Sequence, residues 1–566
     1  MSATAIIITA SAIAALLVPA TPNVRRIPQV VACASSTDAR FGDLPLPPTL
    51  AASLHACGVT APTAIQQASS MDIHRGGHVV LHSETGSGKT YAYLLPLLAR
   101  LHMSRPNQLL IVVPSRELAL QTAAVVERVW EHHGTRRAFV LAGTPPPAQT
   151  AEQLRLAACP VLIATPRPLL ALVKHLAGTD RLHSRRAIAT SGDALLPLVG
   201  KLRAIVLDEA DALLLDRELA IAGPPKRRSH AAVSGGGGEV KAPERFTKPS
   251  AKAVQAILKA RTADSRSGRG GYTRGRGRGR GARGSDRRGD MRRGRGGGRG
   301  GRGGGDDAGV QLVACSATAS FRLREELCRL FGIAHEANLR VISAEDAASG
   351  GSSKQQKRAA GDRGLGGVSV PTSIVHSWVS CADERDKALA VKATLSELSP
   401  RCALLFLADD APLRATVGAL RDGGLDAVML HEAMGFGSGE GGVGSEGELR
   451  ADGYESLSSA LASAESSGDA CKLLVSTHSS ARGLDIASVD CVMLYELPSS
   501  ADQYLHLAGR TGRQGRSGAV VSLLAPHESG SIGKVTRQLG ISIKQHAAIA
   551  LALDEARSGQ PAQVTS

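Results

Sequence analysis

Three carboxylates lie within four positions, directly after a short apolar run. Residues 204–207 read Ala-Ile-Val-Leu and are followed by Asp208, Glu209, Ala210 and Asp211. An unbroken apolar run of this kind is typical of a strand buried on both faces of a parallel sheet, so the acids would lie at its carboxyl end, where open α/β sheets bind ligands. There Asp208 is placed to hold Mg²⁺, directly or through water, and Glu209 to polarise the water that attacks a phosphate. Taken alone, the stretch also fits a strand that runs into an acidic, solvated turn.

A glycine-rich loop upstream favours the metal interpretation. Residues 83–90 read Ser-Glu-Thr-Gly-Ser-Gly-Lys-Thr, between the apolar run 79–81 and a helical pattern over 91–98. A strand, a glycine-rich turn and a helix in this order present backbone N–H groups to phosphates, with Lys89 on the β and γ oxygens and Thr90 on Mg²⁺. A flexible turn with a chance lysine is the alternative, and the flanking elements argue against it. The pattern predicts a nucleotide triphosphatase whose phosphate-binding residues are Thr85, Gly86, Ser87, Gly88, Lys89 and Thr90.

From about Phe41 to Leu524, apart from one large insertion, the order of motifs resembles the DEAD-box RNA helicase family. The resemblance implies an α/β fold of two tandem RecA-like parallel-sheet domains. It also implies ATP and Mg²⁺ as cofactors, and RNA, single-stranded or in a short duplex, as a partner bound without sequence preference. The expected reaction is ATP hydrolysis coupled to RNA unwinding or remodelling.

Residues 62–66, Pro-Thr-Ala-Ile-Gln, resemble the adenine-reading motif of this family. A glutamine amide both donates and accepts a hydrogen bond, which suits the N6 and N7 edge of adenine, so Gln66 favours ATP over GTP. The resemblance adds Phe41 and Thr63 to the nucleotide-binding residues. From spacing alone, an exposed loop glutamine is the alternative.

Further motifs are assigned through the resemblance. Arg116, after the apolar run 109–113, suits a phosphate. Asp485 is expected to reach the ribose of the nucleotide. Arg510 and Arg513 lie one turn apart and are expected to act as arginine fingers on the γ-phosphate; an Arg/Gly surface loop is the alternative. Contacts to the RNA backbone are implied for Pro114, Arg116, Gly143, Thr165, Thr477 and Arg482, and coupling of ATP state to RNA binding for Ser316, Thr318 and His506.

The sequence departs from the family pattern at several RNA-facing motifs. Arg167 and Pro168 stand where Gly then Arg is expected, and Pro168 has no N–H to offer a phosphate. Leu507 replaces an arginine, and a Gly-rich acidic insertion over 433–453 replaces a Gln-x-x-Arg contact. These departures favour the alternative function, an RNA-binding clamp or scaffold with weak ATPase activity. A DNA helicase or remodeller is a third interpretation, against which the Gln66 motif argues.

The net charge of +16 is concentrated in one segment of the 566-residue chain. Residues 261–305 contain fifteen Arg and three Asp without Lys or Glu, which leaves +12 there. A segment of this composition cannot bury a core, so a disordered insertion is expected over about 223–309, with a candidate helix over 251–261. Its Arg side chains are expected to bind RNA and to attract protein partners; a plain flexible linker is the alternative.

Composition also bears on compartment. Nine cysteines without a Cys-x-x-Cys pair argue against a disulfide framework and a structural zinc site, and indicate a reducing compartment. Residues 1–40 have no acid before Asp38 and are rich in Ala, Ser and Thr, which predicts a targeting leader for a plastid. The apolar run 5–18 is too short for an ordinary membrane span, and no membrane association is expected. A mitochondrial, nuclear or nucleolar location is the alternative.

The predicted domain order follows from these segments. An ATP-binding domain over 41–344 and a C-terminal domain over 371–540 are joined by a Gly/Ser/Ala-rich linker over 345–370 and followed by a tail over 541–566. Strands in the second domain are expected over 373–379, 403–407, 426–430, 472–476 and 491–495.

Overall fold

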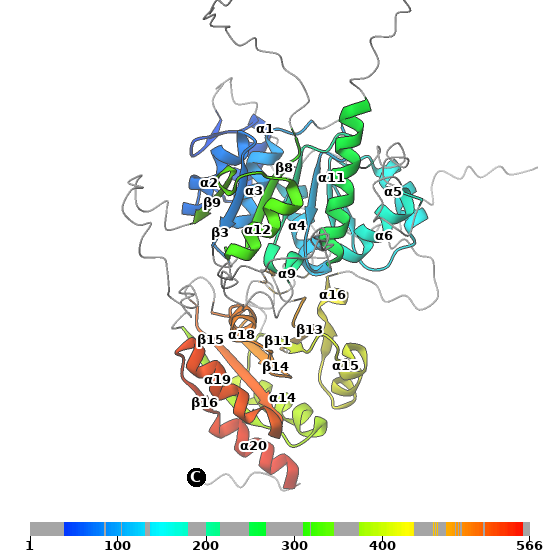
Figure 1. Ribbon diagram of the computed structural model, residues 1–566. Coiled ribbons are helices and arrows are strands. Elements are labelled where there is room, and N and C mark those ends of the chain that lie inside the picture. Colours follow the sequence, from blue (N-terminus) through cyan, green and yellow to red (C-terminus); the bar gives the residue numbers. More distant parts are fainter. Residues whose placement is uncertain are drawn as a thin grey trace, which may run out of the picture. The chain divides into compact units, whose positions relative to one another are not determined.

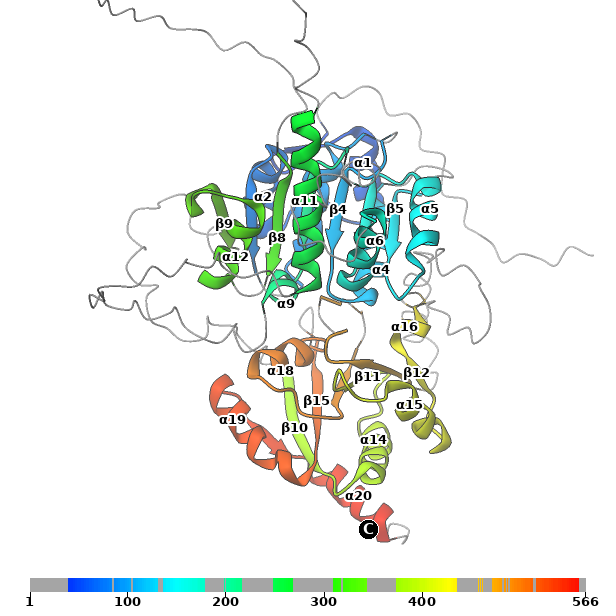
Figure 2. The ribbon, with the colours of Figure 1, turned by 45° about the vertical axis from the view of Figure 1, so that its right-hand side comes forward.

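The computed structural model describes residues 39–83, 86–102, 105–130, 136–178, 198, 200–215, 248–267, 309–316, 319–343, 373–434, 457, 459, 461, 471–480, 483–484, 486, 489–512 and 516–558. Nearly all of the predicted leader, the linker 345–370 and the acidic insertion lie outside these residues, as do residues 268–308 of the Arg/Gly tract. The described elements form two parallel sheets with helices on both faces (Figures 1 and 2).

The first domain is built on a sheet whose described strands, seven in number, are all parallel and follow the order β5-β6-β4-β7-β8-β3-β9. A short antiparallel pair, β1 and β2, precedes it. The strands are β1 Arg40–Phe41, β2 Leu44–Pro45, β3 His78–His82, β4 Leu109–Val112, β5 Ala138–Leu141, β6 Val161–Ala164, β7 Ala204–Leu207, β8 Gln311–Ser316 and β9 Leu339–Ser343. The helices are α1 Pro48–Ala56, α2 Ala64–His74, α3 Lys89–Leu98, α4 Arg116–Val129, α5 Pro147–Ala157, α6 Pro166–Leu176, α9 Ala210–Leu214, α11 Pro249–Ser267 and α12 Phe321–Phe331, with η1 Glu336–Asn338.

Both faces of this sheet are buried, which explains why its strands read as unbroken apolar runs. Alternate strand residues enter two separate cores because side chains on a strand point to opposite faces. Ile205 and Leu207 pack with α5, α6, α9, α11 and α12 on one face. Val206 packs with α1 to α4 on the other face.

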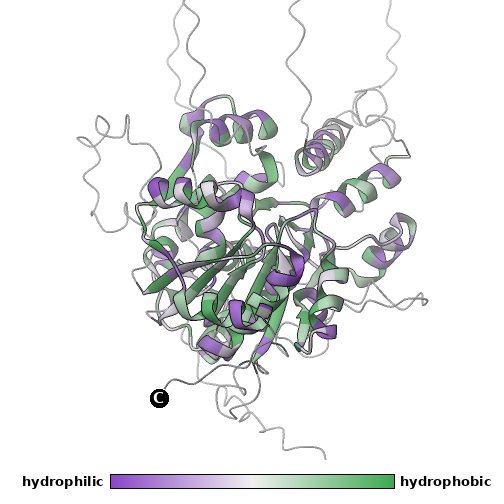
Figure 3. Ribbon diagram, turned by 90° about the horizontal axis from the view of Figure 1, so that it is seen from below, coloured by the Kyte–Doolittle hydropathy of each residue, from purple (hydrophilic) through white to green (hydrophobic). Residues whose placement is uncertain are grey.

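The second domain repeats this architecture. Its described strands form a parallel sheet in the order β12-β13-β11-β14-β15-β10-β16. In Figure 3 the strands are green, and the helices around them alternate green and purple, as expected for a sheet buried on both sides. The strands are β10 Ile374–Ser380, β11 Cys402–Leu407, β12 Ala427–Met429, β13 Lys472–Thr477, β14 Cys491–Leu494, β15 Gly518–Leu524 and β16 Ile543–Gln545. The helices are α14 Glu384–Leu398, α15 Leu413–Asp422, α16 Leu430–Ala433, α18 Ala501–Ala508, α19 Ser529–Leu539 and α20 Ala547–Ser558, with η4 Pro526–Glu528.

The two-domain parallel-sheet fold is confirmed, and each of the five strands predicted for the second domain is present with its ends shifted by at most one residue. Two boundaries were wrong. The segment predicted to be disordered over about 223–309 contains helix α11, which extends the candidate helix 251–261 to Pro249–Ser267. It folds because Val254 and Ile257 bury their side chains in the first core.

The predicted tail over 541–566 is part of the second domain as far as Ser558. Strand β16 pairs with β10, and α20 buries Ile549 and Leu553 in the core. Arg557 of α20 also pairs with Asp386 of α14 at 2.6 Å. Among the described helices, none is both long enough and apolar enough to cross a membrane.

Candidate nucleotide site and nucleic-acid interface

The strand order of the first sheet gathers the predicted motifs along one edge. Because the strands are parallel, every loop that follows a strand lies at the carboxyl edge of the sheet. Strand β7 ends in the acidic stretch, its neighbour β8 ends in Ser316, and the next strand, β3, ends in the phosphate loop. We call these three strand ends the nucleotide half. The neighbouring strands β4, β6 and β5 end in the motifs predicted to contact RNA; we call their ends the RNA half.

The phosphate loop turns through two glycines in the left-handed region, Gly86 at φ 84° and Gly88 at φ 92°. Glycine adopts this conformation without steric penalty, so the loop can fold back before helix α3 begins at Lys89. The ammonium group of Lys89 is buried and donates to the carbonyl of Ser83 at 2.6 Å. The loop therefore closes around the lysine predicted to bind phosphate.

The motif predicted to read adenine is fastened to this loop. Gln66 donates through Nε2 to the carbonyl of Gly88 at 3.0 Å, and its Oε1 accepts from the backbone N–H of Thr63 at 2.9 Å. The Thr63 hydroxyl donates to the carbonyl of Ser87 at 3.0 Å. Gln66 is only 4% exposed, so the alternative of an exposed loop glutamine is wrong. Its adenine contact remains a prediction, as does that of Phe41, whose ring is buried in the core.

Asp208 is buried at the end of β7 with both oxygens held. Its Oδ2 accepts from the Tyr93 hydroxyl at 3.1 Å, and its Oδ1 accepts from the N–H of Glu209 at 3.0 Å. Burial, followed by the negative charge of Glu209, raises the pKa of Asp208 to about 6. The carboxylate is thus fixed in orientation, and its charge is destabilised until a cation reaches it.

Glu209 has two features of a functional residue. Its backbone lies in the left-handed region at φ 53°, which is uncommon for a residue with a side chain. Its side chain is buried, and no donor within the described residues reaches its Oε2. A buried acceptor without a donor suits a water molecule that has to be oriented and deprotonated.

The oxygen atoms in this half fit Mg²⁺, which prefers hard oxygen ligands. Asp208 and Thr90 supply a carboxylate and a hydroxyl next to the phosphate loop. Within the described residues there is no group of three or more His, Cys, Asp or Glu side chains suited to enclose a metal. This pattern is typical of Mg²⁺ that is held by one carboxylate together with the phosphates of a nucleotide.

The coupling motif meets the acidic motif directly. The buried hydroxyl of Ser316, at the end of β8, donates to Oδ1 of Asp211 at 3.0 Å. The bond joins the loop after β7 to the end of the neighbouring strand β8. The two residues are 105 positions apart in the sequence. The coupling role itself remains a prediction, and Thr318 lies outside the described residues.

The RNA half presents separate groups. The Arg116 side chain is 39% exposed and lies 3.5 Å from the buried carboxylate of Glu117. Gly143 has φ 76°, and the Thr165 hydroxyl donates weakly to the carbonyl of Leu141 at 3.4 Å. Pro114 lies beside Ser115, whose hydroxyl caps α4. Pro166 and Pro168 both lie in the first turn of α6, so this helix start offers fewer N–H groups than most.

Two family models match the chain: the DEAD/DEAH box helicase over residues 63–221 and the helicase conserved C-terminal domain over residues 457–515. Over these two stretches the chain is similar to DEAD-box helicases.

Relatives and solved structures of this family differ in how much of the chain they match. DEAD-box ATP-dependent RNA helicase 26 of Oryza sativa is 32% identical over 200 residues, which cover 34% of this chain and 34% of that protein. The matched stretch is thus about a third of that relative. The probable ATP-dependent RNA helicase YfmL of Bacillus subtilis is 23% identical over 87% of this chain and 92% of its own. S. cerevisiae Dbp5, solved with RNA and ADP BeF3, shares the fold at a TM-score of 0.53 and 19% identity, covering 91% of this chain and 96% of its own.

The DEAD-box motifs of the second domain are only partly described. Thr477 ends β13, and its hydroxyl donates to that of Ser480 at 3.2 Å. Arg510 follows α18 and is only 3% exposed; its Nε donates to the carbonyl of His506 at 2.9 Å, and its guanidinium also donates to the carbonyl of Leu484. The role of Arg510 as an arginine finger remains a prediction. Thr85, Arg482, Asp485 and Arg513 lie outside the described residues.

Leu507 stands where the DEAD-box family places an arginine, and its side chain is completely buried in the core of the second domain. Packing thus replaces the charged bond expected at this position. The neighbouring Tyr504 fills the same core, and its hydroxyl is 3.0 Å from Nδ1 of His376. Helix α18 is therefore held on its domain by apolar contacts and by the hydrogen bond between Tyr504 and His376.

Tyr93 is the functional residue that sequence reasoning missed. It lies four positions after Lys89 on α3, so both side chains lie on one face of the helix, toward the sheet. A fully buried tyrosine usually finds a partner for its hydroxyl, and Asp208 was the acid already expected at this edge. That combination is the signal that could have identified it.

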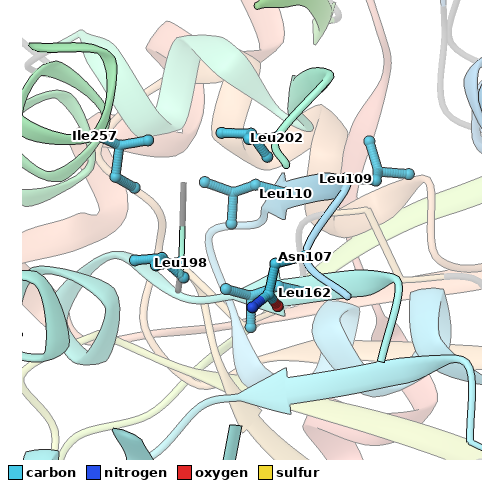
Figure 4. Close-up of a pocket in the computed structure, with 7 residues that line it drawn as sticks. All are labelled: Asn107, Leu109, Leu110, Leu162, Leu198, Leu202 and Ile257. Atoms are coloured by element: carbon cyan, nitrogen blue, oxygen red, sulfur yellow. The ribbon is translucent and has the colours of Figure 1, made fainter. Parts of the chain in front are cut away.

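A small cavity lies elsewhere in the first domain, beneath α11 (Figure 4). It is apolar apart from Asn107, and its strand residues come from the amino ends of β4 and β6. Its position opposite the carboxyl edge separates it from the nucleotide half. The lining residues are Asn107, Leu109, Leu110, Leu162, Leu198, Leu202 and Ile257.

Proposed function

We propose that this chain is an ATP-dependent RNA helicase, which couples binding and hydrolysis of ATP to local unwinding or remodelling of RNA or RNA–protein complexes. The observation that carries the proposal is the nucleotide half. There the phosphate loop supplies Lys89, and the acidic stretch supplies Asp208 and Glu209. Ser316, at the end of β8, bonds Asp211 of the acidic stretch.

Each residue of the nucleotide half has a chemical role in this proposal. Lys89 and the N–H groups of the phosphate loop bind the β and γ phosphates. Glu209 accepts the proton of the attacking water through the oxygen that has no donor in the described chain. When bound, Mg²⁺ neutralises charge on the phosphates, and Asp208 and Thr90 are the residues that would hold it. The opposing arginines, Arg510 and Arg513, are assigned from the family pattern.

RNA as the partner is supported by the relatives, which are named as RNA helicases, and by Dbp5, which was solved with RNA and ADP BeF3. The proposed contacts in the first domain are those of the RNA half, with Arg116 on a phosphate. Closure on RNA and ATP together would strain a duplex, and hydrolysis would release it.

The test is RNA-stimulated ATP turnover by the Glu209→Gln variant. The amide keeps the size of the side chain but cannot accept a proton, so we expect turnover to fall on the order of 10²-fold or more while ATP and RNA still bind. Glu397→Gln, which changes an exposed glutamate of the second domain, is the matched control. Turnover in Glu209→Gln equal to that of the control would overturn the assignment. A wild-type chain that binds ATP and RNA without RNA-stimulated turnover would instead favour the clamp.

We also propose that the Arg/Gly tract tethers RNA and leaves the chemistry unchanged. Deleting residues 268–308 removes most of its Arg, and the free-energy change from loop closure is small because it varies only logarithmically with length. RNA affinity should fall, and its salt dependence should weaken by about 0.7 log–log units for each lost phosphate contact, at unchanged turnover under saturating RNA. Unchanged affinity and slope would identify the tract as a spacer.

A plastid location is proposed from the composition of the first forty residues. A fusion of residues 1–40 to a fluorescent protein should enter plastids. A diffuse cytosolic or a nuclear signal would contradict this proposal.

A further inference from the structure

The edge of the first sheet opposite the nucleotide site is strongly basic. The loops that precede strands meet at this amino edge because the strands are parallel. Six basic residues lie there, in the loops that lead into β3, β4 and β7 or near the ends of α3 and α11; we call them the amino-edge cluster. Its members are Arg75, Arg100, Arg105, Lys201, Arg203 and Arg261.

Hydrogen bonds connect this cluster into one surface. Arg100 donates to Oε1 of Gln311 at 2.8 Å and to the carbonyl of Ile73 at 3.2 Å, two residues before Arg75. Arg203 donates to the carbonyl of Arg100 at 3.1 Å. The guanidinium groups of two arginines are thereby held next to each other.

The remaining members join through backbone groups. The backbone N–H of Arg203 donates to the carbonyl of Gln108 at 2.8 Å, and the Gln108 side chain binds the loop that contains Arg105, donating to the carbonyl of His102 at 2.6 Å. Arg261 donates to the carbonyl of Gly200 at 2.8 Å, next to Lys201. The six side chains therefore come from one connected stretch of surface.

Among the described residues, negative charge is scarce at this edge. Arg75, Arg105 and Lys201 are exposed, and none has an ion pair in the part of the chain that the structure describes. Asp72 is paired with Arg340 at 2.5 Å, and Glu127 accepts the backbone N–H groups of two residues that precede or begin β5. Burial and the positive charge of Arg203 together lower the pKa of Arg100. Positive charges held this close together repel one another, and a bound polyanion would relieve that repulsion.

Helix dipoles explain only part of this arrangement. Cations near helix C-termini are stabilised by the last carbonyls, and this accounts for Arg75, the C-cap of α2, and for Arg100, next to the end of α3. It does not account for Arg105, in the loop before β4, or for Arg261, which lies six residues before the end of α11.

We propose that the amino-edge cluster is a second RNA-binding surface, which contacts the phosphate backbone of single-stranded RNA without sequence preference. Its charge suits a polyanion, and no aromatic side chain belongs to the cluster, so phosphate contacts rather than base stacking would provide the affinity. The choice of RNA as the polyanion rests on the proposed function.

The position of the cluster agrees with this proposal. The Arg/Gly tract leaves the folded domain at the end of α11, which contains Arg261, and returns at β8, whose first residue is Gln311. The strongly basic tract is therefore continuous in sequence with the α11 side of the cluster, while the residues before β8 include Asp306 and Asp307. Helix α3 separates Lys89 from Arg100 by eleven residues, about 16 Å, so RNA bound at the cluster lies away from the nucleotide. Its contribution should not depend on nucleotide state.

The test is RNA binding by the full chain without nucleotide. The triple variant Arg75→Gln, Arg105→Gln, Lys201→Gln removes three exposed charges, none of which has an ion pair within the described residues. The control variant Lys392→Gln, Lys534→Gln, Lys544→Gln removes three exposed charges from the second domain. The probe is a long fluorescent oligouridylate, titrated across a salt series.

The triple variant should bind on the order of 10-fold more weakly than the control, and its log–log salt slope should be smaller by up to about 2, since each phosphate contact on a single strand contributes about 0.7. Basal ATP turnover and turnover at saturating RNA should match the control. Oligouridylate should also protect Lys201 from acylation in the wild-type chain, a measurement that requires no variant.

Equal affinities and slopes in the two variants, or no protection of Lys201, would overturn the proposal. An acidic polypeptide that protects Lys201 where RNA does not would assign the surface to a protein partner instead. RNA binding is measured here without nucleotide, whereas the proposed helicase activity is tested by RNA-stimulated ATP turnover. Failure of one proposal can therefore be distinguished from failure of the other.

Discussion

The nucleotide half and the RNA half lie at one edge of one sheet, but they differ in how firmly their side chains are held. In the nucleotide half, Lys89, Asp208 and Ser316 are buried, and each bonds to another part of the same site. In the RNA half, Arg116 is partly exposed, and the hydroxyl of Thr165 donates only one long bond within the described residues. Groups that are fixed before the ligand arrives suit a reaction with strict geometry, whereas separate groups suit a flexible polymer.

The largest expected effect comes from Lys89→Ala, which breaks the nucleotide half. Removing a cation positioned at the phosphates should lower ATP turnover on the order of 10² to 10³-fold, while RNA binding without nucleotide stays near the wild-type value. Steady-state turnover and RNA affinity measured on the same preparation check this. The control is Lys392→Ala, which changes an exposed lysine of the second domain. A parallel loss of RNA affinity would mean that the two halves are not independent.

Much of the nucleotide half was predictable because its motifs are contiguous in sequence. Residues 79–90 and 204–211 each contain a strand end and its loop, and parallel pairing then brings the two loops to one edge. Contacts between motifs were not predictable in detail. The bond from Gln66 to the carbonyl of Gly88 and the bond from Tyr93 to Asp208 depend on how helices α2 and α3 pack, which local sequence does not determine.

The orientation of Arg510 was not predictable either. Its guanidinium bonds the carbonyls of His506 and Leu484, and no motif encodes these contacts. The missed boundaries have physical reasons as well. Strand β16 reads Ile-Lys-Gln and lies at the edge of its sheet, so it lacks the apolar run that identified the buried strands. The helix over 251–261 was predicted, but its extension to Ser267 was not, because residues 262–267 read Thr-Ala-Asp-Ser-Arg-Ser and lack an apolar pattern.

A smaller effect is expected from Ser316→Ala, which breaks the link between β8 and the acidic stretch. A hydrogen bond to a carboxylate contributes about 1.5 to 3 kcal/mol, so RNA stimulation of turnover should fall about tenfold or more if this bond transmits the state of the site. Turnover without RNA should change little. Ser69→Ala, which removes a buried hydroxyl from α2, is the control. Equal loss of turnover with and without RNA would make Ser316 a structural residue only.

Tyr93→Phe should change the pH dependence of the nucleotide half with a modest change in rate. The pKa of Asp208 is about 6, and its ionised form is the one that holds Mg²⁺, so Mg²⁺–ATP affinity should fall as pH falls through about 6. The Tyr93 hydroxyl stabilises the ionised form. Its removal should therefore raise the pKa and shift this decline to higher pH by roughly half a unit to one unit. Tyr91→Phe, on the same helix, should leave the profile unchanged; a shift in both variants would point to helix packing.

The smallest effect is expected in the RNA half, from Pro168→Ala. Pro168 lies in the first turn of α6, where N–H groups are not used within the helix and can bind a phosphate. Alanine restores one such N–H and is itself a good helix former. RNA should therefore bind about two- to threefold more tightly, which corresponds to roughly 0.5 kcal/mol of binding free energy. Pro48→Ala, at the start of α1, makes the same chemical change at a helix that no RNA motif includes. Weaker binding by Pro168→Ala, or an equal gain by Pro48→Ala, would show that the start of α6 does not contact RNA, and the RNA half would then be limited to the ends of β4 and β5.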